Sequence, residues 1–411
     1  MIRGQMIRVA SGVANRTLSG TRYVRRQTAE ESLLRLAEQI CGPDILTEWN
    51  ITEALAALAA SLQNEASLSA FGHLSFRVEA LRFFRTLRRM KEEEQSRPDI
   101  RERAIRRPLF ITGIPRSGTT FLHNLMTLDP RNVVPRCWQT IYPFPPRGAP
   151  DRRRQKVQRQ FADFLALAPE LPDLHPLAAD LPQECTDIMS YVFRSLRFDT
   201  THAVRSYRRW LDLAGHEIPY RFHRRFLQHL AGAFRETNDA DRTFVLKCPD
   251  HVFALGALRR VYPDALIVLV HRDPAKVMPS VAKLTEVLRA PFTTRLDRMA
   301  IGRQVTGDWL VGTECMIAAQ HRLPAANLLN LTYAEIVGDP AGVMARLYAF
   351  MGRSFEPSLR ARVEAFNDGR PRGGYGRNLY RAEDYGIDTG TIRARFRAYT
   401  EQFGLGFEGA G

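Results

Sequence analysis

The segment PLFITGIPRSGTTFLHNLM, residues 108–126, decides the fold. Its first part, from Leu109 to Thr112, is a short apolar run bounded by proline and glycine, which is typical of a buried strand. From Thr119 onward, apolar side chains recur at helical spacing, so we expect a helix there. The six residues 113–118 would then form a tight loop that runs from a strand into the N-terminus of a helix.

A loop in this position is well suited to bind an anion. Unpaired backbone N–H groups and a helix dipole of roughly half a positive charge favour a phosphate at such a terminus. Arg116 adds a full charge, and Ser117, Thr119 and Thr120 add hydroxyl donors. The sequence therefore predicts a phosphate-binding loop, although a glycine-rich turn without a ligand is the alternative interpretation.

The loop differs from that of nucleotide-triphosphate enzymes. Their motif is G-x-x-x-x-G-K-[ST], in which the lysine contacts the β- and γ-phosphates and the hydroxyl binds Mg²⁺. The spacing from Gly113 to Gly118 is kept, but Thr119 stands where the lysine should be, and the charge lies at Arg116 instead. We therefore expect a loop that holds a 5′-phosphate through hydroxyls and one cation, without a metal-bridged triphosphate.

The composition is that of a globular protein with a large basic excess. The 411 residues carry a net charge of +15, and five of the 59 basic residues are Lys, so each Lys is more informative than an Arg. The excess suits an anionic ligand, an acidic polymer or peripheral contact with an anionic membrane surface. We find no nucleic-acid-binding signature and expect no nucleic acid partner. The five Cys form no C-x-x-C pair, which favours a reducing, cytoplasmic location.

Three regions are predicted along the chain. Residues 1–28 read as a disordered or loosely packed basic tail, and residues 29–107 show the periodicity of a helical N-terminal extension. Residues 108–411 would form an α/β domain with a helical insertion at about 150–235. No apolar run approaches the roughly 18 residues that cross a bilayer.

Within the α/β domain, further apolar runs precede helical patterns. They begin near Phe244, Ala265 and Asn327. Strands that alternate with helices predict an α/β fold with a P-loop-type parallel sheet flanked by helices. Ligands of such sheets bind at the carboxyl ends of the strands. Here these ends carry Arg116, Lys247, Arg272 and Tyr333.

Two motifs in this order resemble the superfamily of sulfotransferases that use 3′-phosphoadenosine-5′-phosphosulfate (PAPS). The stretch GIPRSGTT, residues 113–120, resembles the 5′-phosphosulfate loop of the bacterial branch. The stretch VHRDPAKVMPS, residues 270–280, resembles the 3′-phosphate motif, in which an Arg and a Ser eight residues later hold that phosphate. Arg272 and Ser280 have this spacing. The resemblance extends over roughly residues 55–405.

The resemblance implies PAPS as co-substrate, adenosine 3′,5′-bisphosphate as product, and no metal. Tyr333 would lie near the adenine, although a tyrosine of the core is an equal interpretation, and a late basic loop that includes Arg372 would reach the 3′-phosphate. The implied cofactor-binding residues are Pro115, Arg116, Ser117, Gly118, Thr119, Thr120, Arg272, Ser280, Tyr333, Arg372 and Gly373.

Sulfuryl transfer needs an in-line nucleophile and stabilisation of the charge that grows on the bridging oxygen. Arg116 and Lys247 are our candidates for the second task, and Lys247-Cys-Pro249 has the form of a family element near the leaving phosphate. A surface cation at a strand end is the alternative for Lys247. Arg116 can supply charge but no proton, because a guanidinium stays protonated.

The general base has three candidates, because the task suits a His or a desolvated carboxylate. They are His175 in a proline-rich segment, Glu184 just after it, and His251 four residues past Lys247. We rank His251 last. Each candidate has an alternative interpretation: His175 could be an exposed loop residue, Glu184 could pair with an Arg, and His251 could cap a helix. Some relatives have Trp-Glu where this chain has Trp138-Gln139, and Gln cannot act as a base.

The leading hypothesis is a cytoplasmic, metal-independent sulfotransferase that moves the sulfuryl group from PAPS to a hydroxyl of a small or lipid-like acceptor. Aromatic-rich helices favour an apolar acceptor. A P-loop nucleotide kinase or hydrolase is the alternative; the missing lysine at position 119 disfavours it, and Asp273 keeps it open. A third hypothesis is a protein of this fold that binds anionic partners without turnover. The sequence sets neither the acceptor nor the oligomeric state.

Overall fold

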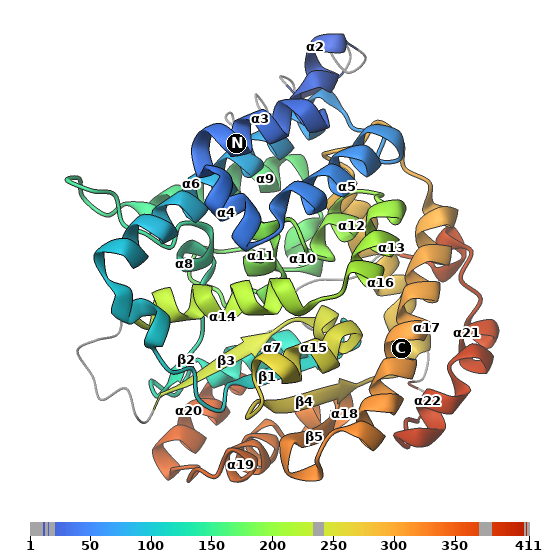
Figure 1. The fold of residues 1–411 in the computed structure, drawn as a ribbon. Coiled ribbons are helices and arrows are strands. Elements are labelled where there is room, and N and C mark those ends of the chain that lie inside the picture. Colours follow the sequence, from blue (N-terminus) through green and yellow to red (C-terminus); the bar gives the residue numbers. More distant parts are fainter. Residues whose placement is uncertain are drawn as a thin grey trace.

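The computed structural model describes residues 11, 12, 15, 21–232, 242–369, 380–406 and 408. Its centre is a five-stranded sheet with the order β2-β3-β1-β4-β5, and all neighbouring strands run parallel (Figure 1). The strands are β1 (Leu109–Gly113), β2 (Asn132–Val133), β3 (Thr243–Lys247), β4 (Leu266–His271) and β5 (Leu328–Thr332). The predicted α/β class with a parallel sheet flanked by helices is confirmed.

The central strands are buried on both faces, which explains their continuous apolar sequences. Along β1, Phe110 joins one apolar cluster, whereas Leu109 and Ile111 join another on the opposite face. The helices that pack against the face of Leu109 and Ile111 are α7 (Thr119–Met126), α18 (Tyr333–Gly338), α19 (Pro340–Met351) and α20 (Pro357–Asp368). The covering of both faces fixes the sheet in the middle of the molecule.

The face of Phe110 is covered by helices from three regions of the chain (Figure 1). From the N-terminal region come α3 (Glu30–Cys41), α4 (Pro43–Glu48), α5 (Ile51–Asn64) and α6 (Ala70–Ser96). The middle region contributes α11 (Cys185–Met189), α12 (Arg197–Thr201), α13 (Arg205–Ala214), α14 (Glu217–Ala231) and α15 (Leu255–Val261). The helices α8 (Cys137–Ile141), α9 (Arg153–Leu167) and α10 (Leu171–Leu174) belong to two smaller apolar clusters. The later helices are α16 (Pro274–Arg289), α17 (Arg298–Arg322), α21 (Thr389–Arg395) and α22 (Arg397–Gln402).

Short 3₁₀ helices connect several of these elements. They are η1 (Arg26–Thr28), η2 (Pro98–Glu102), η3 (Ser190–Val192), η6 (Pro249–Ala254), η7 (Ala325–Asn327) and η8 (Ala382–Tyr385). Within the part of the chain that the structure describes, no helix is both long and apolar enough to cross a membrane.

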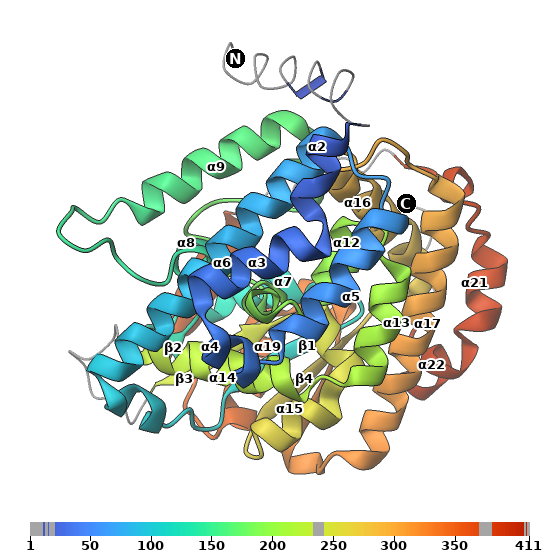
Figure 2. The same ribbon diagram turned by 45° about the horizontal axis from the view of Figure 1, so that its top comes forward.

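The N-terminal helices and the sheet share one core. The largest apolar cluster extends from Leu33 of α3 to Tyr399 of α22 and includes Phe110 of β1. The predicted basic tail falls largely outside the described residues, but residues 22–28 form the short helix α2 (Arg22–Arg25) and η1, with Val24 and Thr28 buried. The helical extension is thus part of the same folded body as the sheet, as Figure 2 shows from above.

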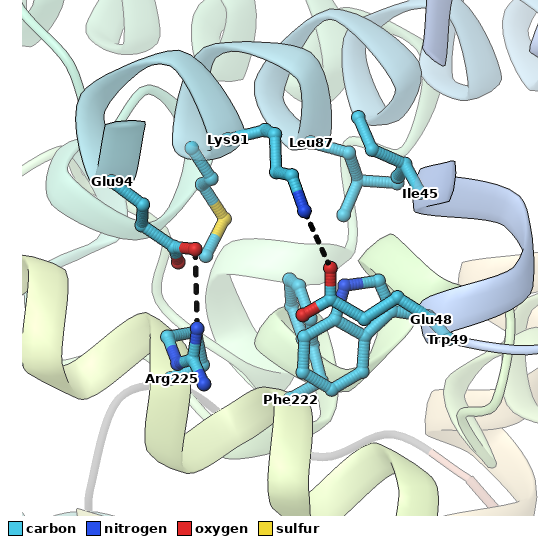
Figure 3. A pocket seen from close by; sticks show the side chains of 9 residues that line it. Ile45, Glu48, Trp49, Leu87, Lys91, Glu94, Phe222 and Arg225 are labelled. Atoms are coloured by element: carbon cyan, nitrogen blue, oxygen red, sulfur yellow. Dashed lines mark hydrogen bonds and ion pairs between the residues drawn. The ribbon is translucent and has the colours of Figure 1, made fainter. Parts of the chain in front are cut away.

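One buried carboxylate connects this extension to the middle of the chain. Glu94 of α6 accepts a hydrogen bond from Arg225 Nη1 of α14 at 3.1 Å (Figure 3). It also accepts one from Arg101 Nε at 2.8 Å and lies 3.0 Å from His229 Nε2. Burial would raise the pKa of Glu94, but these partners outweigh it and lower the pKa to about 2. Nearby, Glu48 pairs with Lys91 in a more exposed position.

We expect Glu94→Gln to lower the free energy of unfolding by roughly 3 kcal/mol at neutral pH, because it takes the charge from a buried carboxylate that Arg101, Arg225 and His229 share. In the wild type, this contribution is complete above the ordinary pKa of 4.5 and is lost as the pH falls from there towards about 2. Urea unfolding at several pH values measures both effects. Glu48→Gln is the control and should cost less than about 1 kcal/mol; equal losses for the two variants would contradict the assignment.

Candidate active site

The loop between β1 and α7 has a conformation that its glycines permit. Gly113 has φ 138°, and a Cβ atom there would lie 2.1 Å from the backbone oxygen of Val270 in the neighbouring strand β4. Gly118, with φ 91°, precedes the first turn of α7. Inside the loop, Ser117 Oγ donates to the Ile114 carbonyl at 2.6 Å. Glycine is therefore required where β1 passes β4, since other residues would clash or be strained.

Arg116 is a partly buried cation surrounded by neutral partners. Its Nε donates to Ser280 Oγ at 3.0 Å, and its Nη1 donates to the carbonyl of Leu174. Among the described residues no carboxylate forms an ion pair with it. Burial lowers the pKa of Arg116 below its usual value, and the nearby charge of Arg272 acts in the same direction. A guanidinium in this setting is stabilised by an incoming anion.

Arg272, which follows β4, reaches the same loop. Its Nη1 donates to the carbonyl of Arg116 at 2.6 Å, and the guanidinium lies 3.7 Å from the centre of the Tyr333 ring. Its Nε and Nη2 donate to the carboxylate of Glu408. Burial would lower the pKa of Arg272, but Glu408 more than compensates and raises it. The two predicted anion-binding motifs thus converge on one place.

A second group of charges lies at the end of β3. Lys247 Nζ forms an ion pair with Glu184 and donates to Thr120 Oγ1 of α7 at 3.3 Å. The thiol of Cys248 lies 3.8 Å from Glu184 Oε2. Burial would raise the pKa of Glu184, but the Lys247 cation outweighs this effect and lowers the pKa. Lys247 is therefore an interior cation that joins α7 to the start of α11, and not a surface residue.

His175 lies in the same electrostatic neighbourhood. It directly follows α10 and is half-buried. Burial lowers the pKa of His175 to about 4, with Lys247 and Arg116 acting in the same direction and Glu184 against them. His175 is thus neutral at pH 7 and stands within electrostatic reach of the other predicted catalytic groups.

His251 is placed differently. Its side chain is 1% exposed, and Nδ1 lies 2.7 Å from the Tyr220 hydroxyl within an aromatic cluster that includes Phe110. Burial holds its pKa well below the usual range. The position argues against His251 as the general base, because an acceptor would have to enter the core to reach it. It belongs to η6 and is a core residue rather than a helix cap.

A family model described as the sulfotransferase family matches residues 108–357. The chain belongs to this family. A curated relative, Omega-hydroxy-beta-dihydromenaquinone-9 sulfotransferase Stf3 of Mycobacterium bovis, is 26% identical over an alignment of 264 residues. The match covers 60% of this chain and 62% of the relative. The match therefore spans less than two thirds of that relative's length.

Two solved structures resemble nearly the whole chain. Sulfotransferase STF1 from Mycobacterium tuberculosis is 28% identical, with a TM-score of 0.76, and the match covers 90% of this chain and 98% of that one. Sulfotransferase STF9 from Mycobacterium avium is 25% identical, with a TM-score of 0.80 and coverage of 93% and 98%. The similarity to sulfotransferases thus includes the N-terminal extension. The superfamily predicted from the two motifs is confirmed.

Membership in the sulfotransferase family favours sulfuryl transfer over the kinase or hydrolase alternative. Asp273, the one acid that had kept that alternative open, caps α16 by accepting from the Ala275 N–H at 2.9 Å. Within the described residues, no cluster of three or more His, Cys, Asp or Glu side chains could hold a metal ion. Arg372 and Gly373 lie outside the described residues.

Several residues at this candidate site carried no recognised sequence signal. Leu174 supplies a carbonyl to Arg116, and Tyr380 lies close enough to Arg116 and Arg272 to affect their pKa values. Glu408 binds Arg272 from 136 residues away. The proline-rich segment around His175 could have drawn attention to Leu174, whereas the other two lie in no motif.

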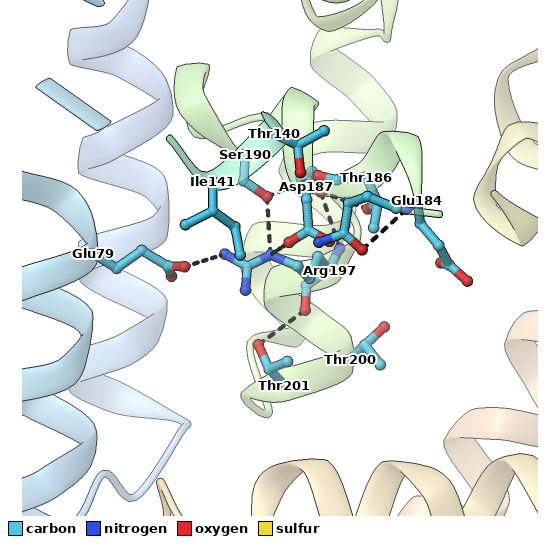
Figure 4. Close-up of polar contacts among 12 residues, drawn as sticks. Glu79, Thr140, Ile141, Glu184, Thr186, Asp187, Ser190, Arg197, Thr200 and Thr201 are labelled. Atoms are coloured by element: carbon cyan, nitrogen blue, oxygen red, sulfur yellow. Dashed lines mark hydrogen bonds and ion pairs between the residues drawn. The ribbon is translucent and has the colours of Figure 1, made fainter. Parts of the chain in front are cut away.

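An ion-pair network joins α11, the helix that follows Glu184, to the N-terminal extension (Figure 4). Arg197 of α12 lies 2.8 Å from Glu79 of α6 and 3.3 Å from Asp187 of α11, the helix that Glu184 precedes. Burial raises the pKa of Asp187 to about 6, although the Arg197 cation opposes the shift. The network ties the extension to the element that positions Glu184.

We expect Gly113→Ala to lower the free energy of unfolding by roughly 2–4 kcal/mol, because the new Cβ would collide with β4 in a strained backbone region. Thermal unfolding measures the effect. Gly307→Ala is the matched control: a Cβ in this α17 position meets nothing within 4 Å, so alanine should stabilise the helix by about 1 kcal/mol or less. A Gly113→Ala protein as stable as the wild type would contradict the close approach.

Proposed function

We propose that this chain is a sulfotransferase that moves the sulfuryl group of PAPS to a hydroxyl of a small or lipid-like acceptor. The observation that carries the proposal is the convergence of Arg116, Arg272 and Lys247 at the carboxyl ends of three neighbouring strands. Arg116 in particular is partly buried without a carboxylate partner among the described residues, as expected of a cation that binds an anionic ligand. Family membership supports the reaction class.

The residues present fit a nucleotide with two separated phosphate groups. Pro115, Arg116, Ser117, Gly118, Thr119 and Thr120 would hold the 5′-phosphosulfate, and Arg272 with Ser280 would hold the 3′-phosphate. Two observations support the fit. The loop conformation requires glycine at position 113, and Arg116 donates to Ser280 at 3.0 Å, which brings the two phosphate-binding groups of residues together. When bound, this co-substrate supplies a sulfuryl group already activated by its bond to a phosphate oxygen.

Within this site, Glu184 is our choice for the general base. As the oxygen of the acceptor forms its bond to sulfur and the bond from sulfur to the phosphate oxygen breaks, the hydroxyl proton passes to the Glu184 carboxylate. Lys247, now paired with Glu184, would turn its charge to the phosphate oxygen on which negative charge develops. The Lys247 cation lowers the pKa of Glu184 and keeps it ionised; once Lys247 turns to the phosphate oxygen, burial raises that pKa and makes the carboxylate a stronger base.

We infer an apolar acceptor that carries a hydroxyl group. The support is the curated relative, which is named for a dihydromenaquinone derivative. We also place the reaction in the cytoplasm. All five cysteines are free thiols, four of them buried, which suits a reducing compartment.

Adenosine 3′,5′-bisphosphate should bind the wild type in a calorimetric titration, with the same affinity with and without Mg²⁺. Arg272→Ala should weaken this binding about 30-fold or more, because truncating a charged contact of this kind costs about 2–5 kcal/mol. Arg397→Ala is the control, since Arg397 is exposed and pairs only loosely with Glu401. Binding of Mg-ATP alone would return the kinase hypothesis to first place.

Glu184→Gln should reduce kcat by about 10²- to 10⁴-fold, the usual contribution of a general base. The assay follows formation of adenosine 3′,5′-bisphosphate from PAPS with a panel of hydroxylated lipids and small alcohols. His175→Asn is the comparison variant and should retain more activity. If His175→Asn shows the larger loss, the base role passes to His175.

A further inference from the structure

The guanidinium of Arg272, our candidate ligand of the 3′-phosphate, already binds a carboxylate of the same chain, that of Glu408. Glu408 accepts a two-pronged contact from Arg272, with Oε1 at 2.9 Å from Nε and Oε2 at 2.8 Å from Nη2. The backbone N–H of Glu408 donates to Asp273 Oδ2 at 3.0 Å, which fixes the residue from a second side. This parallel geometry is the strong form of an arginine–carboxylate contact.

The segment that delivers Glu408 is anchored beside the same strand end. Tyr399 of α22 is buried, and its hydroxyl lies 3.1 Å from His271 Nδ1. The ring of Phe403 stacks on His271 with 3.8 Å between ring centres. Since His271 directly precedes Arg272, the last residue of β4 positions the segment that covers the arginine. Figure 1 shows α22 beside α17 at this edge of the molecule.

A carboxylate and a phosphate make the same demand on a guanidinium. Both accept two parallel N–H bonds from its planar fork. The third nitrogen of Arg272 already donates to the Arg116 carbonyl. An incoming phosphate that binds the Nε and Nη2 side of Arg272 must therefore displace the Glu408 carboxylate.

We propose that Glu408 is a built-in competitor of the 3′-phosphate, which closes the Arg272 seat in the nucleotide-free protein and is released when the nucleotide binds. The inference rests on the proposed function, because it takes Arg272 as the 3′-phosphate ligand. Only molecules in which Glu408 has left Arg272 bind the 3′-phosphate. The apparent affinity for the nucleotide is therefore the intrinsic affinity multiplied by the fraction of such molecules. A nucleotide without a 3′-phosphate has no group to exchange for Glu408 and leaves the seat closed.

Glu408→Gln tests the proposal, since it removes the charge and keeps the size of the side chain. We expect it to bind adenosine 3′,5′-bisphosphate about 3- to 10-fold more tightly than the wild type, in line with a partly exposed ion pair. Its affinity for adenosine 5′-monophosphate should be unchanged. Glu401→Gln, on α22 and paired with Arg397, is the matched control and should alter neither affinity.

The double variant Glu408→Gln/Arg272→Ala separates the possible outcomes. If Glu408 competes through Arg272, its substitution gives no gain once Arg272 is gone. Suppose that Arg272→Ala weakens nucleotide binding and Glu408→Gln does not strengthen it. This result would overturn the role of Glu408 as a competitor but leave the proposed nucleotide site in place. Binding that is absent from the wild type, or insensitive to Arg272→Ala, would instead overturn the proposed function. A gain for both nucleotides would also overturn the proposal, since it would point to a general effect of charge.

Discussion

The close pairing of β1 with β4 is the constraint on which the site depends. Gly113 lies opposite Val270 with no room for a side chain, so the two strands approach fully up to their carboxyl ends. Neighbouring strands are about 4.8 Å apart. The residues that follow β1 and β4 therefore leave the sheet close to each other. The loop with Arg116 and the cation Arg272 therefore meet without any further device, and β3 brings Lys247 to the other side of β1.

The cations at this edge are balanced by acids from outside the sheet. Glu184 reaches Lys247 from the start of α11, and Glu408 reaches Arg272 from beyond α22. Each pair offsets part of the cost of burying its cation. Arg116 has only hydroxyl and carbonyl partners among the described residues, so it gains most from a phosphate. The charges are thus partly satisfied before any ligand arrives.

The sequence predicted much of the sheet because β1, β3 and β4 are buried, mainly apolar runs with polar residues at or just after their ends, and because the partly buried β5 still has three Leu residues. It missed β2, whose two residues are too short to show a period and lie in a proline-rich stretch. Motif spacing identified Arg272 and Ser280 as partners of one site, but the contact of Ser280 with Arg116 depends on the fold. The burial of His251 and the reach of Glu408 depend on helices packed from distant parts of the chain, which no local pattern encodes.

These carboxylates change what nucleotide affinity measures at this site. If the phosphates of a nucleotide replace carboxylates on the same donors, the free energy of binding is the difference between two similar sets of contacts. Part of the favourable electrostatic free energy between the phosphates and the cations is then used to release Glu184 and Glu408, and it does not add to the binding affinity. Release of Glu184 from Lys247 would also free the carboxylate that we assign as the base. Nucleotide binding and preparation of the base would thus be one exchange of partners, and this coupling favours reaction only after the co-substrate is in place.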